Sequence, residues 1–181
     1  MRRLKTDYID IYLLHWKGAV PFHETLEAFR LLKKSGKILN YGVSNFDLSD
    51  MEKAVRLPGG EEILTNQVLY NLSHRGIEWD LLPWCQSKHM PVMAYSPFDE
   101  GRLLDHPFLK EMSVSLSATP AQIALAWLFQ QKDVIAIPKT GRADRIRENY
   151  AALDLSLAEE DRLKLNAIFP PPVNKINLEI I

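Results

Sequence analysis

Five short, apolar, β-prone segments alternate with helical segments along the chain. The expected strands are residues 9–15, 40–43, 64–69, 92–95 and 134–137. Helical spacing of apolar residues, or helix start and stop signals, mark the segments between and after them, at 24–34, 48–57, 77–89, 108–115, 121–131 and 143–153. Parallel strands need long crossover connections, and strand–helix alternation is typical of them. The sequence therefore predicts an α/β fold with about five parallel βα units.

Several local signals set the expected helix ends. Gly36 terminates the first helix, and Thr119-Pro120 supplies an N-cap and a first-turn proline for the helix that follows. Ser156-Leu157-Ala158-Glu159 has the form of a capping box, which predicts a last helix that runs to about residue 168. The prolines at 170–172 end this helix, and residues 173–181 form a tail.

Two architectures fit this alternation: an open doubly wound sheet and a piece of a (β/α)₈ barrel. An open dinucleotide-binding sheet carries a glycine-rich turn after its first strand. Residues 15–21 contain a single glycine, Gly18. The polar residues lie instead just beyond several different strands, which favours a partial barrel.

Composition excludes several function classes. A net charge of −1 without a basic block gives no indication of nucleic-acid binding. The single cysteine, Cys85, rules out an internal disulfide framework and a cysteine-based metal site, and we expect it to be a structural thiol. No apolar run reaches about 18 residues, and the start Met1-Arg2-Arg3 lacks the apolar stretch of a signal peptide. We expect no membrane segment and a cytoplasmic protein.

The first expected strand is largely apolar and β-prone, which is typical of a buried parallel strand, and it ends on His15-Trp16. In a barrel of parallel strands, side chains at the carboxyl ends face the active site, so His15 is a catalytic candidate. A core histidine that donates to a backbone carbonyl is the alternative interpretation of the same residue.

Polar and aromatic residues also follow the other strands. Ser44 and Asn45 could cap the next helix, and Gln67 could be a satisfied core amide. Taken together, the order and spacing of these residues resemble the aldo-keto reductases, which are NADPH-dependent enzymes that reduce aldehydes and ketones on a (β/α)₈ barrel. The resemblance runs from His15 to the tail and is nearest to the small bacterial members. The residues that carry it are His15, Trp16, Ser44, Asn45, Gln67, Tyr95, Ser96, Pro97, Phe98 and 139–149.

The resemblance implies a role for each matching residue near the reacting carbonyl. His15 would orient and polarise the substrate carbonyl, and Trp16 would form an apolar wall of the substrate pocket. Tyr95 would stack on the nicotinamide ring. The nicotinamide carboxamide would be held by Ser44, Asn45 and Gln67. Further cofactor contacts are expected from Ser96, Pro97 and Phe98.

The remaining residues concern the other end of the cofactor. A loop that leads into a helix N-terminus suits a phosphate group, and the resemblance places the adenosine 2′-phosphate of NADPH here. Lys139, Thr140 and Arg145 would clamp this phosphate, while Glu148 and Asn149 would contact the adenine. Arg147 and Arg142 have an alternative interpretation, in which they belong to a basic helix end that faces solvent and do not bind the cofactor.

The chain departs from the family at its front. The family's catalytic tyrosine, lysine and aspartate lie on strands that precede the histidine strand, and only eight residues precede Ile9. We therefore expect residues 1–181 to be one aldo-keto reductase domain that holds strands 4 to 8 and a C-terminal helix and lacks the first three βα units, about 90 residues.

Two functional expectations follow. The first is NADPH-dependent reduction of a small carbonyl, such as a methylglyoxal-type or aromatic aldehyde. The second is a catalytically deficient NADP-binding or interaction module, because the family's proton-donor residues are absent. Five strands cannot close an eight-strand barrel, so the outer strands would expose unpaired edges. We expect a poorly stable monomer, self-association through these edges, or completion by another chain.

Overall fold

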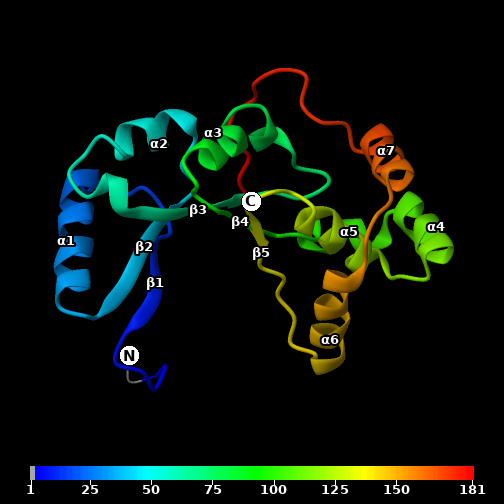
Figure 1. Cartoon of the computed structure of the whole chain (residues 1–181), viewed down its shortest axis with the longest axis horizontal. Helices are drawn as coiled ribbons and strands as arrows, with labels where there is room; N and C mark the ends of the chain where they lie inside the picture. The colour runs from blue at the N-terminus through cyan, green and yellow to red at the C-terminus, as the bar shows by residue number, and fades with distance from the viewer. Residues whose placement is uncertain (1–2) are drawn as a thin grey trace.

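All five expected strands are present and form one parallel sheet. The computed structural model describes residues 3–181, so Met1 and Arg2 lie outside the described residues. The strands pair in sequence order, β1-β2-β3-β4-β5 (Figure 1). Their bounds are β1 Ile9–Leu14, β2 Ile38–Ser44, β3 Ile63–Leu69, β4 Val92–Tyr95 and β5 Val134–Ala136.

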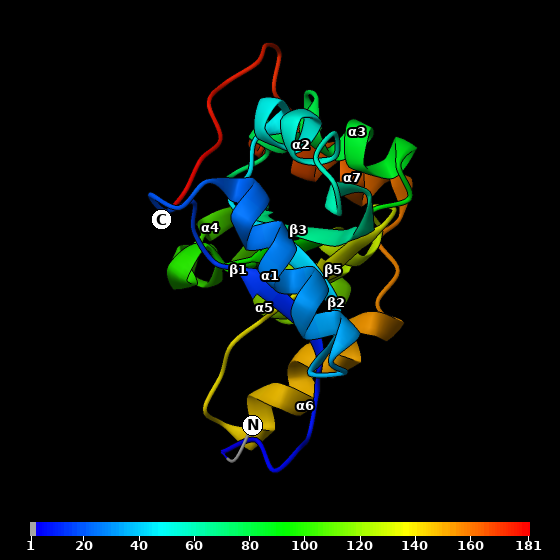
Figure 2. The same ribbon diagram turned by 90° about the vertical axis from the view of Figure 1, so that its left-hand side faces the viewer.

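Seven α-helices are found in the described residues. In Figure 2, α1 lies across the outer face of β1 and β2. Short 3₁₀ segments, η1 to η4, lie at Gly60–Glu62, Gly76–Glu78, Asp99–Asp105 and Ala152–Asp154. The helices are α1 Phe22–Lys34, α2 Leu48–Ala54, α3 Leu81–Ser87, α4 Pro107–Leu116, α5 Pro120–Phe129, α6 Ala143–Ala151 and α7 Glu159–Ile168.

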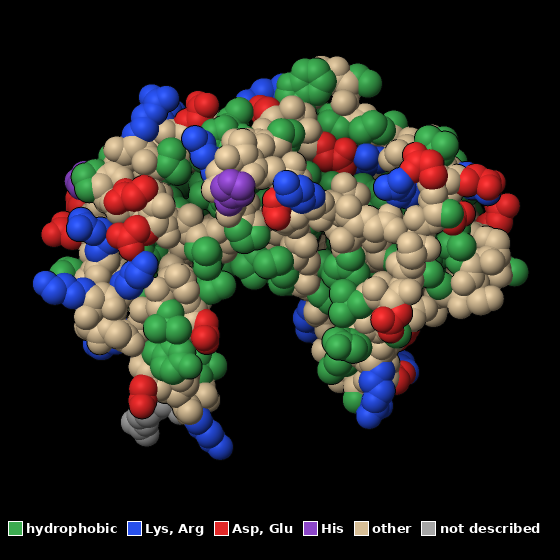
Figure 3. Space-filling view, viewed as in Figure 1, with side chains coloured by type: hydrophobic (Ala, Val, Ile, Leu, Met, Phe, Trp, Pro, Cys, Tyr) green, Lys and Arg blue, Asp and Glu red, His purple; other side chains and the backbone are tan. Residues whose placement is uncertain are grey.

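Within residues 3–181 the sheet stays open, with β1 and β5 at its two edges. The prediction of exposed outer strands is confirmed, and the interpretation of β1 as a buried strand is wrong, because Ile11 is 39% exposed and Tyr12 is 43% exposed. An edge strand has a neighbour on one side only, and Ile135 on β5 is exposed for the same reason. Figure 3 shows a deep notch in the molecule between the limb that holds β1 and the limb that holds α6.

The expected helices are found with most of their ends shifted by a few residues, and two of the helices differ in a way that has a physical cause. The helix predicted over 77–89 is split into η2 and α3, because Pro83 has no N–H for a continuous helix and its ring would clash with the Trp79 carbonyl. The predicted capping box at Ser156 is not formed, because α7 begins at Glu159 and its N-cap residue is Ala158. The backbone before α7 stays non-helical and places the Leu157 side chain in the core.

The start of α5 confirms the sequence prediction. Thr119 caps the helix and forms a reciprocal capping box with Gln122, and Pro120 occupies the first turn. Seven of its ten residues are buried, so α5 is a central helix of the core. Cys85 on α3 is also buried, and burial raises the pKa of its thiol to about 12.

No single helix of the described residues is long and apolar enough to cross a membrane. The α4–α5 pair, bent by 85°, reaches that length and composition only when both helices are taken together.

Candidate functional site

The carboxyl ends of the strands bring six of the predicted residues around one pocket. In the sheet register Ser44 pairs with Gln67 and Leu69 pairs with Tyr95, so β2, β3 and β4 end at the same sheet edge. His15 and Trp16 follow directly after β1 at that edge. The cavity, called here the His15 pocket, has a volume of about 290 Å³. It is lined by His15, Trp16, Ser44, Asn45, Gln67, Tyr95 and Ile181.

A chain of hydrogen bonds fixes the polar wall of the His15 pocket. The Ser44 hydroxyl donates to the Gln67 carbonyl at 2.8 Å, and Asn45 Nδ2 donates to Ser44 Oγ at 3.3 Å. The Tyr95 hydroxyl donates to Asn45 Oδ1 at 3.1 Å. Asn45 has a left-handed backbone (φ 59°), which turns its side chain toward these partners. The hydrogen bonds of the polar wall are therefore formed without a ligand.

Three alternative interpretations from the sequence are wrong. Ser44 and Asn45 do not cap the next helix, because Asp47 is the N-cap of α2 and forms a capping box with Asp50. Gln67 is only half-buried, whereas its neighbour Asn66 is the core amide and donates to the Phe46 carbonyl. His15 is no core histidine: its side chain is exposed, and its ring centroid lies 5.5 Å from that of Trp16.

Tyr95 is the only tyrosine that lines the His15 pocket within residues 3–181. Burial raises the pKa of its hydroxyl, and a backbone hydrogen bond from Ile181 opposes that shift in part. A hydroxyl with a raised pKa holds its proton more firmly at neutral pH. Tyr95 therefore acts as a neutral donor that holds Asn45 in place.

The other eight predicted residues line a second cavity, called here the Lys139 pocket, of about 500 Å³. It lies between the loop after β4, the start of α5, the end of β5 and α6. The predicted residues that line it are Ser96, Pro97, Phe98, Lys139, Thr140, Arg145, Glu148 and Asn149.

The basic residues in and before α6 differ in whether they form an ion pair. The Arg142 guanidinium is paired with Asp144 and holds the pKa of that carboxyl below its usual range. Lys139 and Arg145 are exposed and take part in no ion pair among the described residues. The Thr140 hydroxyl accepts from the Arg142 backbone N–H at 3.2 Å, at the N-cap of α6. Two cations therefore remain available to a ligand, and Arg142 fits the alternative of a solvated helix end.

The loop after β4 was not predicted from the sequence. Ser96, Asp99, Glu100 and Gly101 all have positive φ, between 51° and 97°. Ser96 holds the loop in shape, because its hydroxyl accepts from the Glu100 N–H at 3.1 Å and its carbonyl accepts from Asn71 Nδ2 at 2.8 Å. Non-glycine residues in this region are uncommon and occur often at binding sites. The glycine at 101 was the one local signal of this turn.

Sequence reasoning missed several residues of both pockets. Ile181 is distant in sequence from the other residues of the His15 pocket, and nothing in its local sequence indicates that it returns there. The additional residues of the Lys139 pocket are Glu100, Gly101, Leu104, Thr119, Pro120, Ala121 and Ile137.

The comparison with known proteins decides the family. A sequence model of the Aldo/keto reductase family matches residues 1–169. The chain belongs to the aldo-keto reductases.

Relatives and solved structures of the family match closely but are longer. The Escherichia coli (strain K12) methylglyoxal reductase YeaE is 44% identical over 186 residues, which cover 100% of this chain and 66% of YeaE. A Bacillus subtilis (strain 168) glyoxal reductase is 34% identical over 93% of this chain and 59% of its own length. A Klebsiella pneumoniae aldo/keto reductase, solved with NADP and acetate, is 46% identical with a TM-score of 0.96, over 99% of this chain and 65% of that one. The chain thus spans about three-fifths to two-thirds of the lengths of these relatives.

The side chains of this aldo-keto reductase chain fit a phosphorylated dinucleotide. Tyr95 lines one pocket and the next residue, Ser96, lines the other, so both cavities reach the end of β4. One cavity offers amide and hydroxyl groups, which suit a carboxamide. The other offers Lys139 and Arg145 near a helix N-terminus, which suits phosphate. Among residues 3–181, no three His, Cys, Asp or Glu side chains are grouped as for a metal ion.

Proposed function

We propose that this chain carries the cofactor-binding part and the histidine of an NADPH-dependent aldo-keto reductase that reduces aldehydes and ketones. We further propose that β1–β5 are strands 4 to 8 of a (β/α)₈ barrel, with residues 1–181 as one domain. The observation that carries the proposal is the gathering of all fourteen predicted residues around two pockets that both reach the end of β4. The name of the relative YeaE favours methylglyoxal-type carbonyls as substrates.

The two pockets divide the work of binding. NADP(H) bound across them would supply a hydride to the carbonyl carbon of the substrate, and the carbonyl oxygen would take up a proton from solvent. Ser44, Asn45 and Gln67 would hold the carboxamide, and the hydrogen bonds of Ser44 to the Gln67 carbonyl and to Asn45 keep the Ser44 and Asn45 side chains in place for it. The adenosine end would lie in the Lys139 pocket, where Lys139, Thr140 and Arg145 would bind the 2′-phosphate. Glu148 and Asn149 of α6 would contact the adenine.

His15 acts on the substrate itself. Its exposed imidazole lies beside the Trp16 indole, so a small carbonyl compound can rest against the indole with its oxygen toward the ring N–H. A hydrogen bond to that oxygen becomes stronger as negative charge develops there during reduction, which lowers the barrier. Trp16 supplies an apolar wall that keeps water from the carbonyl carbon.

The proposal is tested by binding and turnover of the purified chain. NADPH should bind with a change in its fluorescence, and only slow NADPH oxidation should follow on addition of methylglyoxal, because this chain does not contain the family's proton-donor tyrosine. His15→Gln should lower kcat/KM by about 10²-fold or more with little effect on NADPH affinity. His23→Gln, which changes an exposed histidine of α1 remote from both pockets, is the matched control.

The outcomes separate the two functional expectations. Turnover that depends on His15 supports a reductase, and absence of NADPH binding contradicts the proposal outright. Tight NADPH binding without turnover would instead favour the catalytically deficient module, an alternative that the comparisons do not support.

A further inference from the structure

Helix α6 carries three residues of the Lys139 pocket, but it has little apolar contact with the core. Arg145, Glu148 and Asn149 all lie on this helix and line the pocket. None of its nine residues is buried, and in Figure 1 it extends away from the sheet below α5. Packing of an apolar face, which holds most helices in place, therefore contributes little here. The position of α6 depends on its other attachments.

One side chain of the central helix α5 supplies such an attachment. Gln122 lies in the first turn of α5, and its Nε2 donates to the Glu148 backbone carbonyl at 3.3 Å. Among residues 3–181, no other side-chain hydrogen bond joins α6 to a different helix or strand. The chain is fixed again only after the helix, where Ala152 is buried. Gln122 is therefore the polar link between α6 and the core.

The Glu148 carbonyl can accept this bond because the helix changes shape at its end. In a regular α-helix this carbonyl would accept from the N–H four residues later, which is that of Ala152. Here the Ala152 N–H bonds to the Asn149 carbonyl instead, and the chain tightens into η4. The Gln122 amide thus supplies a partner that the Glu148 carbonyl does not find in its own helix.

The other end of the Gln122 side chain is held on α5. Its Oε1 accepts from the Thr119 N–H at 2.9 Å, and its backbone N–H donates to the Thr119 hydroxyl at 3.2 Å. The capping box therefore fixes the amide, and its N–H group points to α6. Thr119, Pro120 and Ala121, which directly precede it, line the Lys139 pocket. Gln122 thus joins two helices that both contribute to the wall of this pocket, and it does not line the pocket itself.

We propose that Gln122 is a positioning residue, which fastens α6 to α5 and so places Glu148 and Asn149 for the adenosine part of the cofactor. The inference rests on the proposed function for the identity of the ligand, and it adds a residue that acts on binding through α6. Adenine is common to NADPH and NADH. Loss of the Gln122 bond should therefore weaken both cofactors, whereas loss of the Arg145 guanidinium should weaken NADPH alone.

The variant Gln122→Glu separates the two roles of this side chain. Glutamate keeps an oxygen for the Thr119 N–H, so the capping box of α5 remains, but it has no donor for the Glu148 carbonyl. In fluorescence titrations of the full chain, we expect the affinities for NADPH and NADH each to fall by about threefold to tenfold, the equivalent of one hydrogen bond. The midpoint of urea unfolding should stay close to that of the parent chain, because α5 keeps its cap.

Two further variants separate the lost bond from the added charge. Gln122→Met removes the same donor without adding a charge, and it should weaken both cofactors to a similar extent. Gln130→Glu is the matched control, because Gln130 lies at the other end of α5 and its Nε2 donates to the Leu157 carbonyl at 3.2 Å, outside both pockets. It should leave both affinities unchanged. A loss confined to NADPH and to Gln122→Glu would show repulsion of the phosphate by the new charge and would overturn the proposal.

Amide hydrogen exchange tests the attachment of α6 without any cofactor. Exchange in residues 143–151 should become about threefold to tenfold faster in Gln122→Glu and in Gln122→Met, while exchange in α5 of Gln122→Glu and in α6 of Gln130→Glu should match the parent. Unchanged exchange in α6, or unchanged affinity for both cofactors, overturns the proposal. A parent chain that binds neither cofactor contradicts the proposed function, and the exchange rates still decide whether Gln122 holds α6.

Discussion

Arg145→Ala should distinguish the two nicotinamide cofactors. Arg145 lines the Lys139 pocket within the first turn of α6 and forms no ion pair in the described residues, so its guanidinium is free to bind the 2′-phosphate that only NADPH carries. A charge-assisted hydrogen bond contributes about 1.5–3 kcal/mol. Because Arg145 is exposed and hydrated, we take the lower value, which corresponds to about a tenfold loss of NADPH affinity. Lys139 remains and should preserve part of the binding.

Fluorescence titration of NADPH and NADH against both proteins measures the effect. NADH affinity should be nearly unchanged, because NADH has no phosphate at this position. Arg147→Ala is the matched control, since Arg147 lies on the same helix but does not line the pocket. Equal losses for both cofactors in Arg145→Ala would refute the assignment and would mean that Arg145 stabilises α6. A similar NADPH-specific loss in Arg147→Ala would point to a general effect of positive charge.

Three further predictions concern the fold. Gly42→Ala should lower the free energy of unfolding by about 1–3 kcal/mol in urea titrations, because a Cβ at this strand position would lie 2.5 Å from the Thr65 carbonyl oxygen. Gly18→Ala is the control and should change the free energy of unfolding little, because a Cβ there meets no atom within 4 Å. The Cys85 thiol should react with Ellman's reagent at pH 8 only after addition of denaturant, since burial raises its pKa to about 12, and rapid reaction of the native protein would contradict the packing of α3. Self-association through the sheet edges should fall on replacing exposed Ile11 and Ile135 by lysine, as seen by analytical ultracentrifugation, and an unchanged sedimentation coefficient would exclude these edges as the contact.

The order of the elements could be predicted because it depends on local pattern. Apolar β-prone runs gave all five strands, and helical spacing with start signals such as Thr119-Pro120 gave the helices. The clustering of the candidate site followed from topology, since the carboxyl ends of parallel strands meet at one edge and bring Ser44, Gln67 and Tyr95 together. Roles within the cluster came from the family resemblance.

Features that depend on distant partners could not be predicted. The local sequence of β1, with Ile, Tyr and Leu, is equally suited to a buried position, and its exposure could be expected only from the number of strands, which leaves β1 at an edge. The capping-box pattern at Ser156 was outweighed by the burial of Leu157, which requires non-helical backbone where the pattern favoured a helix. An N-cap residue stabilises a helix by about 1 kcal/mol, whereas burial of a leucine side chain contributes about 1.5–3 kcal/mol.

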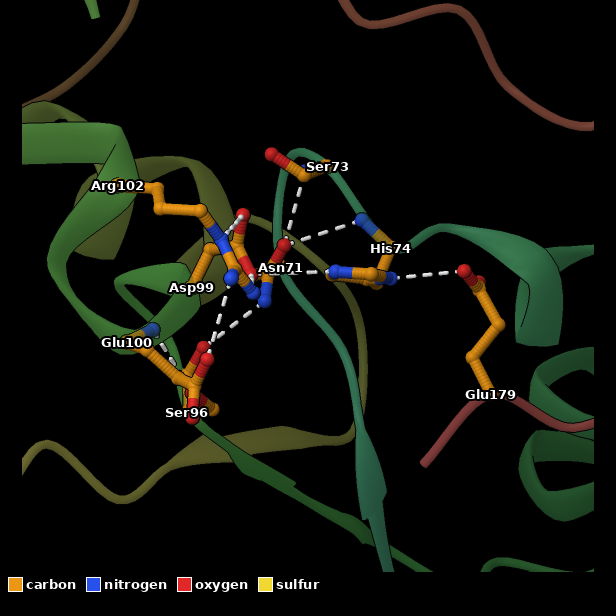
Figure 4. A network of polar contacts seen from close by, with 8 residues as sticks. All are labelled: Asn71, Ser73, His74, Ser96, Asp99, Glu100, Arg102 and Glu179. Atoms are coloured by element: carbon orange, nitrogen blue, oxygen red, sulfur yellow. Dashed lines mark hydrogen bonds and ion pairs between the residues drawn. The ribbon is translucent and has the colours of Figure 1, made fainter. Parts of the chain in front are cut away.

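The contacts of His74 could not be predicted from the sequence. Its partners, Asp99 and Glu179, are 25 and 105 residues away, and each lies in a segment without a regular repeat (Figure 4). Helical and strand periodicity report only which residues share a face of one element. Contacts between a turn, a loop of positive φ and the irregular C-terminal segment, residues 173–181, depend instead on three separate backbone paths. Because the same C-terminal segment places Ile181 in the His15 pocket, local sequence patterns could not predict this part of the site either.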